Sequence, residues 1–130
     1  MEINPRTSDA KDPRRRFGDR GEDFAADFFT AQGFRLVARN WSCRLGEIDL
    51  IVARDGVVRF VEVKTRRTTT YGNPEEAITQ SKLKHLARAI EAYLRACTSP
   101  PEDYQADALA ITLLPGQSPQ FHWVEHILYR

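Results

Sequence analysis

Cysteine is scarce in this chain: two residues, Cys43 and Cys97, occur among 130. They lie far apart in the sequence, no CxxC motif is present, and neither forms a cluster with histidine. A disulfide framework and a structural zinc site are excluded as organising features, because both need several suitably spaced thiols. We expect two reduced and partly buried thiols.

Long hydrophobic runs are also missing. No apolar stretch approaches the roughly 20 residues that a membrane-spanning helix needs. The N-terminal segment MEINPRTSDAKDPRRR is polar and basic, so it lacks the apolar region of a signal peptide. The sequence therefore predicts a cytoplasmic protein with no membrane partner.

A strong net charge is the third absence, since 19 basic and 18 acidic side chains leave +1 at pH 7. This balance does not by itself indicate a nucleic acid as partner. Most of the basic residues are arginine, whose planar guanidinium suits phosphates and surface carboxylates alike. The positions of the basic residues must therefore decide between these two partners.

The chain does have enough apolar content, 42%, for one ordinary core, and its length suits one domain. We interpret residues 1–16 as a mobile basic arm and residues 17–130 as a single α/β domain. Hydrophobic periodicity predicts two helices and, beside a central hairpin, three strands. The first helix runs from Phe17 to a cap at Gly33, and the second begins at Asn73-Pro74, with a restart at Thr79, and ends before Pro100. The three strands cover Phe34–Trp41, Tyr104–Leu114 and Phe121–Tyr129.

The central hairpin is the most informative stretch, GEIDLIVARDGVVRFVEVKTR. Two apolar-rich runs flank Asp55-Gly56, a dipeptide typical of two-residue hairpin loops. If these two residues form the loop, the register places Asp49 opposite Glu62 and Glu47 opposite Lys64. A slip of one residue would separate these charges onto different faces, so the register is a sharp prediction.

Opposed residues, and residues two apart in a strand, share a face of the sheet. One face of the hairpin is thus predicted to carry Glu47, Asp49, Glu62 and Lys64 at one end, continued by Ile51, Ala53, Val58 and Phe60. The other face is predicted to carry Ile48, Leu50, Val52, Val61 and Val63.

Two opposed carboxylates destabilise a strand pair, and their joint desolvation costs more still. An exposed salt-bridge cluster would be the ordinary explanation for Asp49, Glu62 and Lys64, but it leaves the acid pair unexplained. A divalent cation offsets that repulsion, and with only oxygen ligands in view Mg²⁺ or Mn²⁺ fits better than Zn²⁺. Lys64 could then orient a metal-bound water or stabilise charge on a phosphate. Glu47 could instead pair with Lys64 across the strands.

Basic residues follow the hairpin in two places. Arg66 and Arg67 lie in a polar loop, where they could contact phosphate or simply be solvated. Lys82 and Lys84 lie near the start of the second helix, where the helix dipole disfavours cations, which indicates that an anion binds there.

The pattern of Asp49 followed by Glu62-Val63-Lys64 resembles the core signature of the PD-(D/E)xK nuclease superfamily. Further elements are similar to the small bacterial YraN-like family, which is in turn similar to archaeal Holliday-junction resolvases. These are Gly18-x-x-Gly21-Glu22, Arg39-Asn40-Trp41, Tyr71-Gly72-Asn73-Pro74 and Lys82. The resemblance covers about residues 17–114.

The resemblance implies a restriction-endonuclease-like fold, with a mixed central sheet of four or five strands flanked by helices. It also implies that Asp49, Glu62 and the Val63 carbonyl ligate the metal, that Glu22 completes the acidic shell, and that Lys64 is the catalytic lysine. Lys82 would lie near the nucleic acid. Family members usually carry Arg-Phe-Asp where this chain has Gln105-Ala106-Asp107, so the role of that arginine is open.

Three functions are compatible with these residues. The first is a Mg²⁺- or Mn²⁺-dependent endonuclease acting on DNA, with branched DNA and a two-fold homodimer suggested by the resolvase resemblance. The second is a non-catalytic nucleic-acid-binding protein with a nuclease-like fold. The third is a small interaction protein whose acidic corner meets a basic partner. The sequence does not distinguish DNA from RNA.

Overall fold

The computed structural model describes residues 13–68, 72–73 and 78–128, with side chains from Arg20 onward. Its core is a five-stranded sheet in the order β1-β2-β3-β4-β5. The β3–β4 pair is parallel and the other pairs are antiparallel, so the sheet is mixed. The elements are α1 (Pro13–Thr30), β1 (Arg35–Cys43), β2 (Gly46–Arg54), β3 (Val57–Arg66), α2 (Gln80–Ala96), β4 (Asp103–Thr112) and β5 (Gln120–Val124). This α/β architecture is the predicted one, and it is consistent with a nuclease-like fold.

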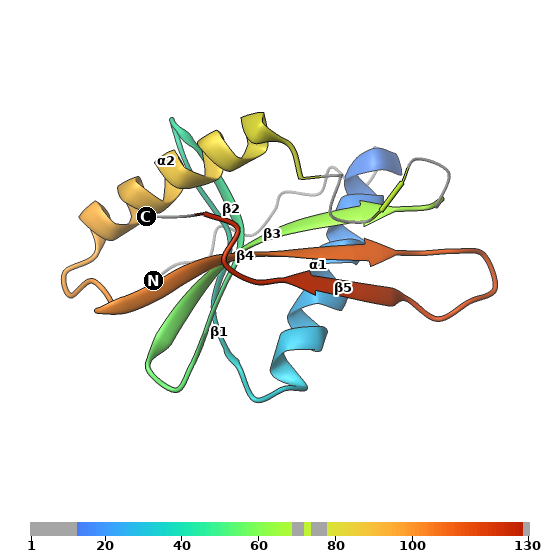
Figure 1. Cartoon of the computed structure of the whole chain (residues 1–130), viewed down its shortest axis with the longest axis horizontal. Helices are drawn as coiled ribbons and strands as arrows, with labels where there is room; N and C mark the ends of the chain where they lie inside the picture. Colours follow the sequence, from blue (N-terminus) through green and yellow to red (C-terminus); the bar gives the residue numbers. More distant parts are fainter. Residues whose placement is uncertain (1–12, 69–71, 74–77, 129–130) are drawn as a thin grey trace.

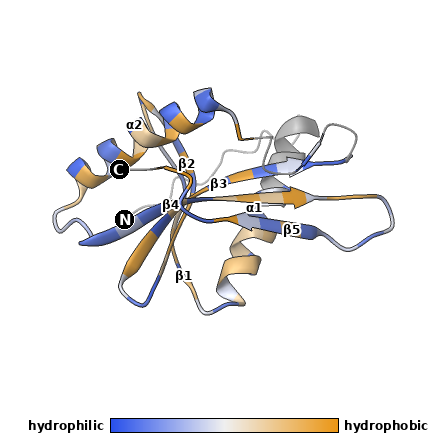
Figure 2. Ribbon diagram, viewed as in Figure 1, coloured by the Kyte–Doolittle hydropathy of each residue, from blue (hydrophilic) through white to orange (hydrophobic). Residues whose placement is uncertain are grey.

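The two helices cover opposite faces of the sheet (Figure 1). The α1 face is filled by Phe29 and Phe34 packed on Leu50, Val61 and the β4 side chains. The α2 face is filled by three buried helix residues, Leu86, Ala89 and Ile90, packed on strand residues that include Ile51 and Phe60. Figure 2 shows the result, with hydrophobic residues on the side of α2 that meets the sheet and hydrophilic ones on its outer side. Within the described residues no helix is long and apolar enough to cross a membrane.

Helix α1 begins at Pro13, four residues before the predicted start at Phe17. Proline is favoured in the first turn of a helix, because that turn needs no N–H donor and proline already has helical φ. Four residues of the predicted basic arm therefore belong to α1, and residues 1–12 lie outside the described part of the chain. The helix closes as predicted at Gly33, whose φ is +88°.

Helix α2 has Thr79 as its N-cap, as the predicted restart requires, and the Thr79 hydroxyl accepts a hydrogen bond from the Lys82 N–H at 3.2 Å. The earlier start predicted at Asn73-Pro74 falls largely on residues 74–77, which lie outside the described residues. Both cysteines are free thiols and half-buried, as predicted.

Strand β5 ends at Val124, five residues before the predicted end at Tyr129. The chain turns at His126, whose φ is +56°, and the His126 N–H donates to the Asp107 carboxylate at 3.1 Å. The Ile127 N–H then donates to the Ala106 carbonyl at 2.8 Å. The buried Asp107 carboxylate therefore stabilises the turn that follows β5 by accepting a hydrogen bond from its backbone.

Asp107 is fully buried, and Gln105 is one of its hydrogen-bond partners. Its carboxylate accepts from Gln105 Nε2 at 2.9 Å, Arg59 Nη1 at 3.0 Å and Trp123 Nε1 at 3.0 Å. Arg59 is the neighbour of Gln105 across the β3–β4 pair. The Arg59 guanidinium, which comes from β3, therefore neutralises the buried Asp107 carboxylate.

Candidate metal centre

The hairpin register is confirmed where the two strands pair. Leu50 faces Val61 at one end of the ladder and Arg54 faces Val57 at the other. Asp55 and Gly56 form the loop, both with positive φ (55° and 79°), as a tight two-residue turn requires.

Beyond Leu50 and Val61 the predicted pairing is wrong, because β2 and β3 separate. The ladder between them ends at that pair, whereas β2 stays paired with β1 to Gly46 and β3 with β4 to Arg66. Figure 1 shows β3, β4 and β5 running side by side while the β1–β2 hairpin turns away from them. We call the opening between residues 47–49 of β2 and residues 62–64 of β3 the fork.

Asp49 bridges the two sides of the fork. Its Oδ2 accepts a hydrogen bond from the Val63 backbone N–H at 2.8 Å, where a continued ladder would have used a backbone carbonyl. The side chain of Asp49 therefore lies between the strands, and Val63 is tied to it through its N–H. A metal-ligand role for the Val63 carbonyl stays a prediction.

The predicted alternation of faces is also wrong for Ile48, which packs on the α2 face with Ile51 and not with Leu50 on the α1 face. The neighbouring strand changes face at the same level, since Ala38 and Trp41, three residues apart, both meet the α2 core. Asn40, between them, has φ +52°, which breaks the two-residue repeat of an extended strand. The backbone irregularity thus coincides with the position of Asp49.

Three carboxylates converge at the fork: Glu22, Glu47 and Asp49 each place an oxygen within 4.8 Å of the others. Glu22 is 9% exposed and comes from α1, as the family resemblance implied. Glu47, which the sequence left between catalysis and a simple pairing with Lys64, joins this acidic group. Glu62 lies beside it, hydrogen-bonded to Asp49.

Two glycines, each directly before a glutamate, allow this convergence. A Cβ on Gly21 would overlap the Thr65 hydroxyl of β3, so glycine lets α1 lie against the strand and brings Glu22 to the fork. A Cβ on Gly46 would lie 2.8 Å from the His85 carbonyl oxygen of α2, so glycine also seats the start of β2 against that helix. The sequence showed both glycines without revealing either contact.

The pKa of Asp49 is raised to about 8, first by burial and then by the charge of Glu62, although the Val63 N–H bond acts in the opposite direction. The pKa of Glu62 is also raised, chiefly by burial, against the opposing effect of Lys82. Both acids are therefore costly to ionise in the metal-free protein, which is the electrostatic problem that a bound cation relieves.

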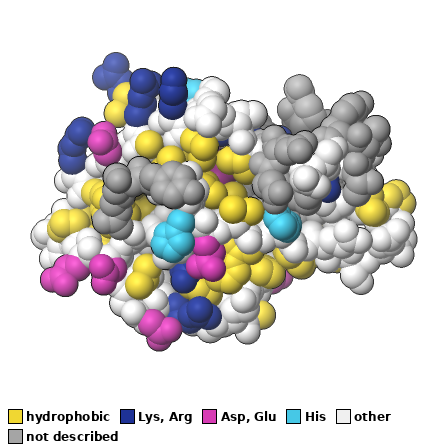
Figure 3. Space-filling model, in the orientation of Figure 1, with side chains coloured by type: hydrophobic (Ala, Val, Ile, Leu, Met, Phe, Trp, Pro, Cys, Tyr) yellow, Lys and Arg dark blue, Asp and Glu magenta, His cyan; other side chains and the backbone are white. Residues whose placement is uncertain are grey.

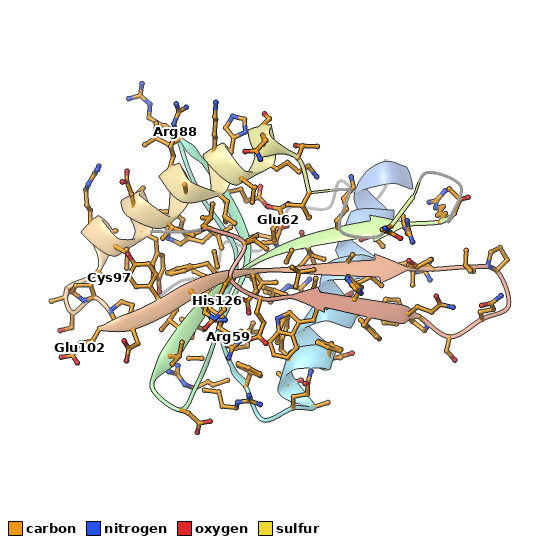
Figure 4. The ribbon with its side chains drawn as sticks, in the orientation of Figure 1. Arg59, Glu62, Arg88, Cys97, Glu102 and His126 are labelled. Atoms are coloured by element: carbon orange, nitrogen blue, oxygen red, sulfur yellow. The ribbon has the colours of Figure 1, made fainter. Side chains whose placement is uncertain are left out.

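Lys64 and Lys82 bring positive charge to the same place. The pKa of Lys64 is lowered, first by the Lys82 ammonium and then by burial, while Glu62 and Asp49 act in the opposite direction. Figure 4 shows Glu62 rising from β3 toward the N-terminal end of α2, the end that carries Lys82. The fork thus joins an acidic group to two adjacent ammonium groups.

The other basic residues singled out in the sequence lie farther along these elements. Arg66 donates to the Thr112 hydroxyl at 3.0 Å and to the Gly72 carbonyl at 2.7 Å, so it holds the loop after β3. Arg67 and Lys84 are exposed. No separate role was predicted for Arg39, whose guanidinium lies 3.8 Å from Glu22 and 2.7 Å from Asp23 and thereby holds α1 beside β1.

The donor set suits a hard divalent cation, since it consists of carboxylate oxygens drawn from a helix and a strand. Oxygen ligands of one Mg²⁺ lie at most about 4.2 Å apart, twice the ~2.1 Å metal–oxygen distance. The Glu22, Glu47 and Asp49 oxygens lie within 4.8 Å of one another, so they would have to move closer together to share such an ion. The chemistry of the donor set fits Mg²⁺ or Mn²⁺.

Comparison with known proteins gives one consistent result. The model of "Uncharacterised protein family UPF0102" matches residues 21–111 of this chain. A UPF0102 protein of Herpetosiphon aurantiacus is 40% identical over 116 residues, which cover 86% of this chain and 94% of the relative. One from Symbiobacterium thermophilum is 48% identical over 97 residues (75% and 82%), and one from Neisseria meningitidis is 41% identical over 110 residues (85% and 92%). The matched segment contains the acidic group and both lysines.

Proposed function

This chain belongs to the uncharacterised protein family UPF0102, and we propose that it is a divalent-metal-dependent nuclease that hydrolyses phosphodiester bonds. The observation that carries the proposal is the convergence of three carboxylates in the fork, beside Glu62 and two lysines. A merely structural cluster would be expected to pair each acid with a base at the surface, whereas here Asp49 is desolvated among other acids.

Each group has a place in the hydrolysis, in which water adds to phosphorus and one P–O ester bond breaks. Glu22, Glu47 and Asp49 would hold Mg²⁺ or Mn²⁺, with Glu62 as a further ligand or as a hydrogen-bond partner of Asp49. The ion, when bound, supplies Lewis-acid polarisation of the phosphate and of water. Lys64 would donate hydrogen bonds to the non-bridging phosphate oxygens as negative charge grows on them. Lys82, beside Lys64, would add positive charge at the same phosphate.

We propose DNA as the substrate, including branched forms such as flaps and four-way junctions. The support is the similarity of the YraN-like family to the archaeal resolvases, together with the basic residues Lys82 and Lys84 on the helix that adjoins the fork. A phosphodiester backbone is the common chemistry of these substrates, and RNA serves as the comparison substrate in the test.

The test is cleavage of plasmid, flap, four-way-junction and RNA substrates with Mg²⁺ or Mn²⁺. Wild-type protein should cleave at least one DNA substrate and should stop when the metal is chelated. Asp49→Ala and Lys64→Ala should each lower the rate at least about a hundredfold, since one removes a metal ligand and the other a group that stabilises the transition state. Arg95→Gln, a substitution at the far end of α2, is the matched control and should keep wild-type activity.

Cleavage that survives both the Asp49 and the Lys64 substitutions would contradict the proposal. So would a wild-type protein that binds nucleic acid without cleaving any of the substrates.

A further inference from the structure

A second basic surface lies outside the fork and has no part in the chemistry described above. We define the α2 patch as Arg44, from the turn between β1 and β2, together with Lys84 and Arg88 on the outer side of α2; all three are exposed. Figure 3 shows Lys and Arg side chains gathered along α2, and Figure 4 shows Arg88 pointing away from the sheet. The patch is therefore a solvent-exposed group of three cationic side chains.

The patch is assembled from two elements by the close approach at Gly46. Because the backbone of Gly46 lies against His85 and Ala89, the β1–β2 turn abuts α2 beside the residues that directly follow Lys84 and Arg88. The next residue after Gly46 is Glu47, a member of the acidic group. Arg44 of the patch therefore precedes Glu47 of the fork by three residues in the chain.

The like charges of the patch repel one another weakly, and a bound anion would relieve that repulsion. Lys84 and Arg88 are four residues apart, a spacing at which like charges destabilise a helix. Helix α2 carries four basic residues and one acidic residue, Glu91, and two of the basic residues lie in its first two turns, where the dipole opposes them. Over residues 13–68, 72–73 and 78–128, no ion pair forms to Arg44, Lys84 or Arg88, whereas Arg95 lies 3.7 Å from Glu91.

The spacing from the fork suits a nucleic-acid backbone. Lys82 interacts electrostatically with Glu62 and Lys64 in the fork. Arg88 follows Lys82 by six residues, which corresponds to about 9 Å along a helix that rises 1.5 Å per residue. Successive phosphates of one DNA strand are about 3.4 Å apart along the duplex axis. If a duplex with one phosphate at Lys64 ran parallel to α2, a phosphate two or three nucleotides away would lie at the level of Arg88.

We propose that the α2 patch binds the sugar–phosphate backbone of the duplex arm that flanks the phosphate in the fork. The proposal rests on the proposed nuclease function for the position of that phosphate, and it assigns Arg44 and Arg88 to substrate binding. The contacts are to phosphates, so the patch contributes affinity and orientation without reading sequence.

The test is binding of a fluorescein-labelled 30-base-pair duplex and a four-way junction, followed by anisotropy in EDTA between 50 and 300 mM NaCl. The double substitution Arg44→Gln/Arg88→Gln should make the slope of log affinity against log salt shallower by about 1.8, since each lost phosphate contact removes about 0.9. Affinity at 100 mM salt should fall by about tenfold or more. Arg95→Gln, on the same helix but paired with Glu91, is the control and should change neither quantity.

Equal slope and equal affinity in the double variant would overturn the proposal, as would a loss of affinity for anionic phosphatidylserine vesicles with DNA binding unchanged. Calorimetry with Mn²⁺ separates this outcome from failure of the proposed function. If the double variant loses DNA affinity but the wild type binds Mn²⁺ and cleaves nothing, the nuclease assignment falls and the patch assignment stands. If the wild type cleaves DNA and the double variant binds DNA as well as the wild type does, the nuclease assignment stands and the patch assignment falls.

Discussion

Asp49→Asn is expected to make the metal-free protein more stable while abolishing its response to Mn²⁺. Folding the wild type at pH 7 forces Asp49 either to take up a proton or to keep a charge in a desolvated place beside Glu62. Asparagine removes that cost and can still accept the Val63 N–H hydrogen bond. The gain should be on the order of a few kcal/mol, or several degrees in Tm, because a tenfold change in an acid's ionisation constant on folding corresponds to ~1.4 kcal/mol.

The measurement is thermal unfolding of wild type and variant with EDTA and with 5 mM Mn²⁺. The matched control is Asp55→Asn in the hairpin loop, because Asp55 is exposed and asparagine tolerates its positive φ. That control should leave both the metal-free Tm and the Mn²⁺ response unchanged. A lower metal-free Tm for Asp49→Asn, or a retained Mn²⁺ response, would contradict the electrostatic interpretation of the fork.

The stability of the metal-free protein is expected to fall as pH rises toward 8, and bound metal should reverse this trend. The pKa of Asp49 is raised from 3.8 to about 8 on folding, and the pKa of Glu62 is raised as well. A group whose pKa is raised on folding contributes its full stability below the unfolded value, near pH 4, and loses it as pH rises through the folded value, near pH 8. Metal ligands must be deprotonated, so Mn²⁺ binding strengthens over the same window.

The experiment is thermal unfolding from pH 5 to pH 8 with EDTA or with Mn²⁺. The Mn²⁺-induced rise in Tm should be smallest at pH 5 and largest at pH 8, where a concentration one hundred times Kd adds about 2.7 kcal/mol. In Asp49→Asn, the Tm measured in EDTA should decrease much less between pH 5 and pH 8 than it does in the wild type. A Mn²⁺ effect of the same size at every pH would show that the raised carboxyl pKa values and the metal site are unrelated.

The parts of the fold that local signals specify were predicted from the sequence. The Asp55-Gly56 loop sets the β2–β3 register through backbone geometry alone, so Leu50 opposite Val61 follows from a dipeptide. The Thr79 cap of α2 and the Gly33 end of α1 are equally local. Each of these predictions needs only residues within a few positions of one another.

The fork itself could not be predicted from local sequence, because it depends on which strand occupies each edge of β3. Parallel pairing with β4, more than forty residues away, holds Glu62 to Arg66, while β1 holds the start of β2. The face change at Ile48 likewise depends on the backbone of Asn40 in the neighbouring strand. The sequence therefore predicted the correct residues for the site but not their arrangement. Asp49 and Glu62 were expected to pair across adjacent strands, whereas they line the opening where β2 and β3 separate.

Glu22 illustrates a second limit. Its place at the site came from family resemblance and not from the helix pattern, since a glutamate on the flank of a helix is common. The contact of Gly21 with Thr65 brings Glu22 to Asp49, and these two contacting residues lie far apart in the sequence. The contacts of Gly46 with His85 and of Arg59 with Asp107 are also between distant residues, so no local sequence pattern predicts them.

The most direct measurement is anomalous diffraction from a crystal soaked in Mn²⁺ at pH 8. We expect one strong peak within coordination distance of Glu22, Glu47 and Asp49, at the point where β2 leaves β3. A crystal that diffracts well and shows no peak there, or shows Mn²⁺ only at other surface acids, would mean that these three carboxylates do not hold a metal.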